Sequence, residues 1–245
     1  MTSTPHDNIF DAIDATWPAA KRWTDGGITF RSGQGGGSRV SAATTNAPVT
    51  DTAIHAAAKV MTAMEQSALF MVQGGQTALD TQLARLGYAV KDPCYIYTAP
   101  LPRLTMQPLP HKTCFGVFPP LASQKEVWGN GGIGAARLAI MDRVRGPKVS
   151  FLGRAGDTPA GTVFAAIHGQ TAMLHALEVN NDHRRCGLGR HLSHAVAHWA
   201  AMRGAKHLAL ITTTANIGAN TLYASLGMEV VGQYHYRIMT KGTDT

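Results

Sequence analysis

The clearest pattern of hydrophobic and polar positions in the chain lies between residues 172 and 202. It begins with the run AMLHALEV, whose length and apolar character are typical of a largely buried strand. A polar turn and the basic, glycine-containing loop HRRCGLGR follow. Apolar residues then recur at three- and four-residue intervals, the spacing of one buried helix face: Leu188, Leu192, Ala195, Val196 and Trp199. A strand, a loop and a long helix are therefore predicted in this order.

The rest of the second half alternates between shorter predicted helices and strands. Helix is expected over 122–145, where glycines interrupt it, and again over 217–226, where Gly227 is typical of a helix C-terminus. Strands are expected at 149–154, 161–168, 207–213 and 229–239. This order predicts an α/β domain.

The first half predicts a smaller set of α/β elements. Phe10, Ile13 and Trp17 form one face of a short helix before a proline. The glycine-rich SGQGGGS is followed by neither Gly-Lys-Ser/Thr nor a helix, so we expect a flexible hairpin turn and not a phosphate loop. Strands are expected at 28–31, 39–44 and 68–72, helices at 51–66 and 76–86, and a β-rich run at 88–100.

Two short segments, LARLGYAV at 83–90 and YASLGMEV at 223–230, resemble each other. Similar orders of strand and helix surround them, which indicates a decayed internal duplication. The stretch between Pro100 and Pro120 is rich in proline, which discourages regular structure. We therefore predict two domains, 1–105 and 106–245.

The composition is that of an ordinary folded protein, with 245 residues, of which 44% are hydrophobic and 15% charged. No apolar run is long enough to cross a membrane, and the first residues lack the basic and apolar regions of a leader. We therefore expect a soluble, cytoplasmic protein with no membrane partner. Three cysteines, an odd and widely spaced set, favour neither a disulfide framework nor a structural zinc site.

The net charge of +7 favours an anionic ligand or partner. Because the basic residues are scattered and form no stripe with aromatic residues, we do not expect nucleic acid to bind. His194 and His198 have the i, i+4 spacing of helical zinc ligands, and His183 and His191 lie nearby. No His-Glu-x-x-His motif accompanies them, so we expect no bound metal.

The loop HRRCGLGR resembles the Gln/Arg-x-x-Gly-x-Gly/Ala signature of the GNAT superfamily of acyl-CoA-dependent N-acyltransferases. Downstream, NIGANTLYASLGM is similar to the family segment Asn-x-x-Ala-x-x-Leu-Tyr-x-x-x-Gly. The resemblance covers roughly residues 120–240, and the first half resembles a degenerate relative, as in tandem GNAT proteins. It implies an α/β fold with a GNAT-like mixed, mostly antiparallel sheet flanked by helices, and a second, smaller α/β domain at the N-terminus.

The resemblance implies a binding site for acetyl-CoA at the start of the long helix. A helix N-terminus leaves backbone N–H donors free for a pyrophosphate, glycines allow close approach, and arginines add charge-assisted bonds. Main-chain groups of the preceding strand are implied to pair with the pantetheine and to polarise the thioester. The predicted residues in contact with acetyl-CoA are Leu177, Val179, Arg184, Arg185, Gly187, Leu188, Gly189, Arg190 and Asn216.

Two residues are predicted to act in catalysis. Tyr223 stands where the family places a general acid that protonates the departing thiolate, and a phenol is protonated at neutral pH. Glu178 is the predicted base, with His175 or a water chain as alternatives. Strand alternation is expected to put the side chains of Glu178 and His175 on opposite faces. Asn216 is expected either to bond the pantetheine or to cap its helix.

The predicted function is transfer of an acetyl group from acetyl-CoA to a primary amine by direct attack in a ternary complex. The alternative is a non-catalytic acyl-CoA-binding sensor or regulatory protein. The acceptor, a small-molecule or peptide amine, and the oligomeric state, including a homodimer, stay open. Glu126, Trp128 and Arg137 lie where this family often borders its acceptor, with helix packing and surface roles as alternatives.

Overall fold

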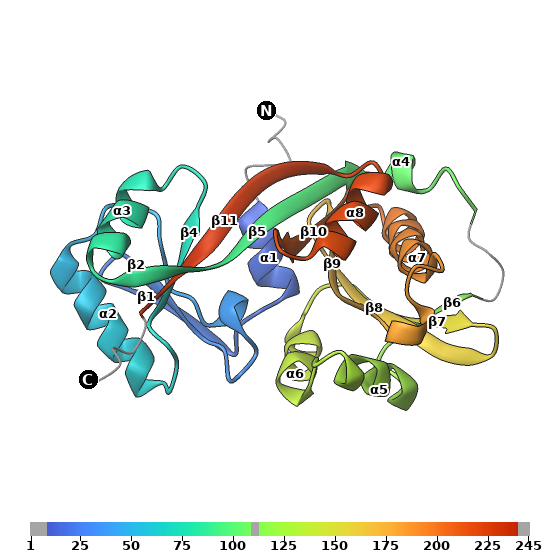
Figure 1. Ribbon diagram of the computed structural model, residues 1–245, viewed down its shortest axis with the longest axis horizontal. Helices are drawn as coiled ribbons and strands as arrows, with labels where there is room; N and C mark the ends of the chain where they lie inside the picture. The colour runs from blue at the N-terminus through green and yellow to red at the C-terminus, as the bar shows by residue number, and fades with distance from the viewer. Residues whose placement is uncertain (1–8, 109–112, 240–245) are drawn as a thin grey trace. The chain divides into compact units, whose positions relative to one another are not determined.

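The computed structural model describes residues 9–108 and 113–239, which form two compact units (Figure 1). Unit 1 consists of the described residues up to Pro18 together with Ile96–Thr212 and Asn216–Val231. Unit 2 consists of Ala19–Tyr95, Thr213–Ala215 and the described residues from Gly232 onward. Residues 1–8, on which the expectation of no leader depends, and 109–112 of the proline-rich stretch lie outside the described residues.

Unit 1 is built on a mixed, mostly antiparallel sheet, as predicted. Successive strands from β6 to β9 are antiparallel neighbours, and β10 then pairs with β9 in parallel. Two long strands, β5 and β11, follow β10 in the strand order. The strands are β6 (Cys114–Val117), β7 (Lys148–Ala155), β8 (Thr158–His168), β9 (Thr171–Val179), β10 (His207–Thr213), β5 (Tyr88–Pro100) and β11 (Glu229–Met239). Only Ile96–Pro100 of β5 and Glu229–Val231 of β11 belong to unit 1, and the rest of these two strands belongs to unit 2.

Helices cover both faces of this sheet, as two neighbouring residues of β8 show (Figure 1). A Cβ atom at Gly161 would lie 3.1 Å from Leu188 of α7. The next residue, Thr162, points to the opposite face, where its hydroxyl accepts a hydrogen bond from Gln124 of α5. The helices of unit 1 are α1 (Ile9–Thr16), α4 (Leu101–Leu104), α5 (Ala122–Asn130), α6 (Ala135–Arg143), α7 (Leu188–Met202) and α8 (Ile217–Ser225). None of the helices in the described ranges is both long and apolar enough to span a membrane.

Unit 2 contains a second, smaller α/β arrangement. A three-stranded sheet has the order β1-β2-β3, and a further strand, β4, pairs with the end of β11. The hydroxyl of Thr50 caps helix α2 by accepting the N–H of Ala53. The elements are β1 (Lys21–Asp25), β2 (Ile28–Ser32), β3 (Thr44–Thr45), α2 (Asp51–Ala63), β4 (Leu69–Gln73) and α3 (Thr77–Arg85).

The strand predicted at 39–44 is wrong. Residues Ser38–Val40 form a short 3-10 helix, and only Thr44–Thr45 pair with β2 as a strand. The physical reason is that the N–H groups of Ser41 and Ala42 both bond to the carbonyl of Ser38, so this part of the backbone closes a turn and does not pair in a ladder. The predicted antiparallel pairing of this segment with 28–31 is nevertheless present, across a longer connection than a hairpin turn.

The two halves of the chain repeat one another at a separation of 140 positions. Helix α3, Thr77–Arg85, corresponds residue for residue to α8, Ile217–Ser225. Each is followed by a glycine with positive φ, at Gly87 and Gly227. This agreement in bounds and in turn geometry supports the predicted internal duplication.

The repeated strands are exchanged between the units. β11, from the second half of the chain, pairs with β4 of the first half in unit 2. β5, from the first half, runs along β10 in unit 1, where the hydroxyl of Thr98 donates to the carbonyl of Leu208. The division at residues 105 and 106 stays a prediction about the two halves of the chain, because the compact units follow a different partition.

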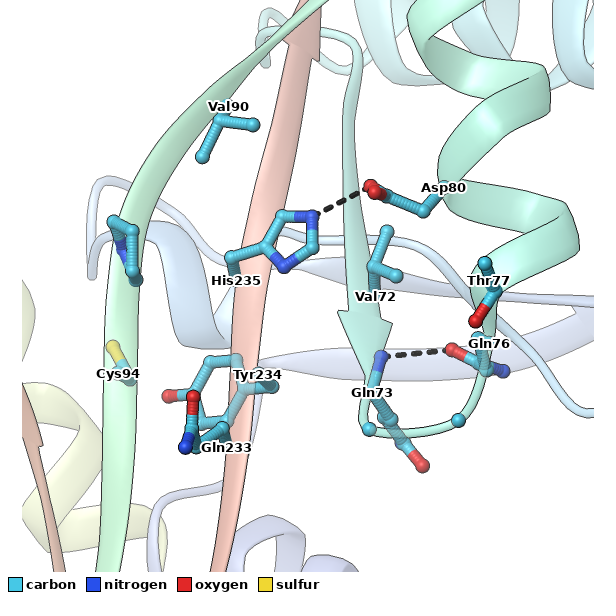
Figure 2. A pocket seen from close by; sticks show the side chains of 13 residues that line it. Val72, Gln73, Gln76, Thr77, Asp80, Val90, Cys94, Gln233, Tyr234 and His235 are labelled. Atoms are coloured by element: carbon cyan, nitrogen blue, oxygen red, sulfur yellow. Dashed lines mark hydrogen bonds and ion pairs between the residues drawn. The ribbon is translucent and has the colours of Figure 1, made fainter.

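A charged cluster on α3 and β11 holds unit 2 together at one of these exchanged strands. Asp80 Oδ1 accepts a hydrogen bond of 2.7 Å from Nε2 of His235 (Figure 2). It accepts a second one, also of 2.7 Å, from Nε of Arg237. Asp80 and His235 also line a cavity of about 350 Å³. The hydrogen bond from Arg237, followed by that from His235, outweighs desolvation and lowers the pKa of Asp80.

We predict that Asp80→Asn destabilises the protein at neutral pH by on the order of 1–2 kcal/mol, because it weakens two charge-assisted hydrogen bonds. A lowered pKa in the folded state means that this stabilisation is present above the unfolded-state pKa and is lost as the pH falls through the folded-state pKa. Chemical unfolding at several pH values should therefore show a difference between wild type and variant that shrinks on acidification. Asp157→Asn, on a fully exposed turn, is the control. A difference that does not depend on pH would contradict the prediction.

Candidate active site

Strands β9 and β10 separate part of the way along unit 1. Their parallel ladder runs only from the pair Thr171 and His207 to the pair Leu174 and Leu210, although both strands continue beyond it. Beyond Leu174, the edge of β9 that faces β10 therefore carries main-chain groups that this ladder does not bond. The predicted pairing of this strand with a pantetheine requires such an open strand edge.

A β-bulge lies in β9 at this point. On β8, Thr162 and Phe164 face Glu178 and His175, so the single residue between them, Val163, faces both Ala176 and Leu177. Ala176 has φ of 51°, a left-handed conformation that costs a non-glycine residue free energy. The carbonyl of Ala176 accepts a hydrogen bond of 2.7 Å from the indole N–H of Trp128.

The bulge corrects the expectation that Glu178 and His175 point to opposite faces. Thr162 and Phe164 are two residues apart on β8 and share a face, so the residues opposite them also share one. The inserted residue changes the alternation along β9. His175 is 3% exposed and packs against Trp17, and its Nε2–H donates to Thr16, whose own hydroxyl proton goes to the carbonyl of Ala12. His175 therefore has a structural role in the core.

The predicted loop leads into α7 with an open helix N-terminus. Gly187 is the N-cap residue with φ of 83°, and no side chain caps the helix. The first turn contains no acidic residue, and its N–H groups have no intrahelical acceptors. Arg185 and Gly187 are exposed. This combination leaves donors and the positive end of the helix dipole available to an anion.

Gly189 has a different role from Gly187. A Cβ atom at Gly189 would lie 3.1 Å from Leu222 of α8 and 3.8 Å from Leu177 of β9. The absence of a side chain here allows α7, α8 and β9 to approach one another. Leu188, on the same turn, is buried against Gly153 and Gly161 of the sheet. Gly189 and Leu188 thus set where the helix N-terminus lies.

Two predicted residues with different roles contact each other. Arg184 donates from Nη2 to the carboxylate of Glu178 at 2.8 Å and from Nε to the carbonyl of Val179 at 2.9 Å. The predicted base and a predicted phosphate ligand therefore form one ion pair. Arg190 donates to the hydroxyl of Ser225 on α8, and its side chain also borders the loop.

Sequence reasoning missed the contribution of Gly131 and underestimated that of Trp128. A Cβ atom at Gly131 would lie 2.5 Å from Cδ of Glu178, so this loop residue packs directly against the predicted base. Trp128 is fully buried and contacts the bulge, whereas Glu126 and Arg137 are exposed. The glycines after residue 128 were visible in the sequence, but their partner on β9 was not.

Residues 124–228 match the model of the family described as Acetyltransferase (GNAT) family. This segment contains β9, the loop, α7, β10 and α8. Residues 124–228 are a GNAT domain.

The whole fold is similar to solved structures of the same superfamily. A GCN5-related N-acetyltransferase from Kribbella flavida superposes with a TM-score of 0.69 at 17% identity, over 97% of this chain and 96% of that one. A tandem GNAT protein from the clavulanic acid biosynthesis pathway superposes with a TM-score of 0.56 at 13% identity, over 82% of this chain and 76% of that one. These similarities extend the GNAT-like fold to the N-terminal half and confirm the predicted two-domain α/β class.

A curated relative aligns with part of the chain. N-acetyltransferase family 8 member 3 from Rattus norvegicus is 31% identical over 68 residues, 28% of this chain. The alignment spans 30% of the length of that relative.

Tyr223 and Asn216 lie on α8 of the GNAT domain. Tyr223 is 4% exposed, its ring centroid is 5.9 Å from that of Tyr97, and burial raises its pKa well above the usual value. The side chain of Asn216 accepts the N–H of Ala219 at 3.1 Å, so it caps the helix. Of the two roles expected for Asn216, the structure contains the cap.

The histidines of α7 contact main-chain groups of unit 1. Nδ1 of His194 and Nε2 of His198 donate to the carbonyls of Leu104 and Gln107, at 2.7 Å and 3.0 Å. Burial, followed by the charges of His194 and Arg190, lowers the pKa of His191. Across residues 9–108 and 113–239, no group of three or more metal-ligating side chains lies together.

We predict that Asn216→Ala lowers the free energy of unfolding by about 1 kcal/mol, because the N–H of Ala219 loses its acceptor. Asn216→Ser keeps an oxygen at the cap and should retain most of the stability. Urea unfolding of the three proteins measures the difference. Equal stability of the alanine and serine variants would contradict a capping role.

Proposed function

We propose that this protein transfers an acetyl group from acetyl-CoA to a primary amine by direct attack. The observation that supports it best is the position of an uncapped helix N-terminus beside the end of the β9–β10 ladder. The helix N-terminus offers N–H donors to a pyrophosphate. The strand edge beyond the end of the ladder offers main-chain groups to a pantetheine and a thioester.

Donor binding is assigned to the loop and the first turn of α7. The N–H groups of Gly187, Leu188, Gly189 and Arg190 would hold the pyrophosphate, with φ of 83° at Gly187 turning the backbone toward it. Arg185 is exposed and available for a charge-assisted bond. Arg184, already bonded to β9, would instead hold the loop against the strand.

Thioester activation is assigned to the second half of β9. Leu177 is the second residue of the bulge, and its side chain faces α7, since a Cβ atom at Gly189 would lie 3.8 Å from it. Val179 also faces α7, because it lies opposite Gly161, which contacts Leu188. Their main-chain groups at the open edge would pair with the pantetheine, and one N–H would stabilise the oxygen that becomes negative during attack. An N–H held in a sheet is already oriented, so no free energy is spent on ordering it at the transition state.

Glu178 is the proposed base for the incoming ammonium group. Its side chain is only 17% exposed and accepts a hydrogen bond of 2.8 Å from Arg184, so the carboxylate lies beside the donor loop. A side chain at position 131 would collide with this carboxylate, so Gly131 is what allows Glu178 its position. The same ion pair would also fix the orientation of the carboxylate and so the side from which the amine approaches it.

Tyr223 is the proposed acid. Because burial raises the pKa of its phenol, Tyr223 is protonated at neutral pH and carries a proton for the leaving thiolate. The corresponding position in the first half is Leu83, which is fully buried and has no proton to give. We therefore expect one donor site per chain, in the GNAT domain. A cytoplasmic location stays a prediction.

The alternative is an acyl-CoA-binding sensor that performs no chemistry. The ion pair between Glu178 and Arg184 favours it, because a base bonded to an arginine is less available to an amine. A screen of amines with acetyl-CoA decides between them. Coenzyme A should be measured by chromatography, since the exposed Cys186 would react with a thiol reagent. Binding of acetyl-CoA with no turnover of any amine would support the sensor.

We predict that Tyr223→Phe lowers kcat at least about tenfold while the Kd for acetyl-CoA changes little, because only the proton donor is removed. Tyr97→Phe is the matched control, since Tyr97 is also buried and lies next to Tyr223 but donates to Asn220. Steady-state kinetics and calorimetry measure the two effects. Wild-type kcat in Tyr223→Phe would remove it as the acid.

A further inference from the structure

The indole of Trp128 donates to the carbonyl of Ala176, one of the two residues that the bulge places opposite Val163 of β8. Trp128 is 0% exposed, and its Nε1–H lies 2.7 Å from the oxygen of Ala176. Because Ala176 and Leu177 together face Val163, the main chain at Ala176 has no regular partner on β8. A displaced carbonyl needs another donor, and Trp128 supplies it.

The bulge depends on such a donor, because its conformation is costly. Alanine with φ of 51° is in the left-handed region, which L-residues other than glycine rarely adopt. Strained conformations of this kind persist only where surrounding contacts hold them. The hydrogen bond from Trp128 is a contact that acts directly on the strained residue.

Helix α5 can hold this donor in place because it is anchored to the sheet elsewhere. Gln124, one turn before Trp128, is fully buried. Its Nε2 donates to Thr162 on β8, and its Oε1 accepts from Ser150 on β7, both at 3.3 Å. Removal of the indole N–H would therefore release the bulge without detaching the helix.

We propose that Trp128 is a positioning residue for acyl transfer, holding the bulge of β9 so that the N–H of Leu177 meets the thioester oxygen. This inference rests on the proposed function, since it assigns a supporting residue to the same site. Trp128 itself touches neither donor nor acceptor. Its effect acts through the thioester oxygen, which the N–H of Leu177 meets in bound acetyl-CoA and holds more strongly as that oxygen gains charge during attack.

The test is Trp128→Phe, which keeps an aromatic ring and removes the N–H. We expect kcat to fall about tenfold or more, since misplacing an oxyanion donor is costly, while the Kd for coenzyme A changes less than about threefold. Trp199→Phe is the matched control, because Trp199 is also a buried tryptophan of unit 1 but lies on α7. The kcat of this variant should stay at the wild-type value.

A binding readout separates this inference from the proposed function. Only acetyl-CoA carries the thioester oxygen, so Trp128→Phe should lower the ratio of the affinity for acetyl-CoA to the affinity for coenzyme A. Calorimetry gives this ratio even if the wild type acetylates no amine, in which case the function fails and the positioning role is still tested. An unchanged affinity ratio in Trp128→Phe, or equal loss of both affinities, would overturn the inference.

Discussion

The proposed active site depends on main-chain groups of β9 beyond the point where the ladder between β9 and β10 ends. A β-sheet normally bonds the N–H and carbonyl groups of its inner strands, so an open stretch in the middle is costly unless something uses it. Here the ladder ends at Leu174 and Leu210, and the bulge at Ala176 follows two residues later. An extended ligand that pairs with the edge of β9 would bond these N–H and carbonyl groups. We therefore interpret the opening as a binding site.

The second constraint is the close approach of α7 to this opening. Glycines at 153, 161 and 189 let Leu188 and Leu192 pack directly on the strands and let α8 approach the first turn. The position of the helix N-terminus is therefore set by packing of apolar side chains, which is rigid. The donors at Gly187 and beyond keep their direction because the residues behind them cannot move.

Much of the fold could be predicted because its signals are local. The bounds of β5, β10 and β11 follow from runs of apolar and β-branched residues, and the ends of α3 and α8 follow from Gly87 and Gly227. The loop around Gly187 was recognisable from its spacing. The strand predicted at 39–44 is wrong because hydrogen bonds from Ser41 and Ala42 to Ser38 close a turn there, and no local pattern predicts them.

The contacts that organise the site could not be predicted, because they join residues far apart in the chain. Trp128 bonds Ala176, and Gly131 packs on Glu178, in each case across more than forty residues. The bulge also reversed the alternation on which the placement of Glu178 and His175 depended. No local pattern predicts that an alanine has a positive φ. Nor does one predict the exchange of β5 and β11 between the two units.

The most direct measurement of the central claim is a crystal structure of the protein with coenzyme A bound. The account predicts the pyrophosphate on the N–H groups of residues 187–190 and the pantetheine along Leu177–Val179, in the gap beyond Leu174 and Leu210. A coenzyme A molecule bound elsewhere, or one whose pantetheine does not pair with β9, would contradict it.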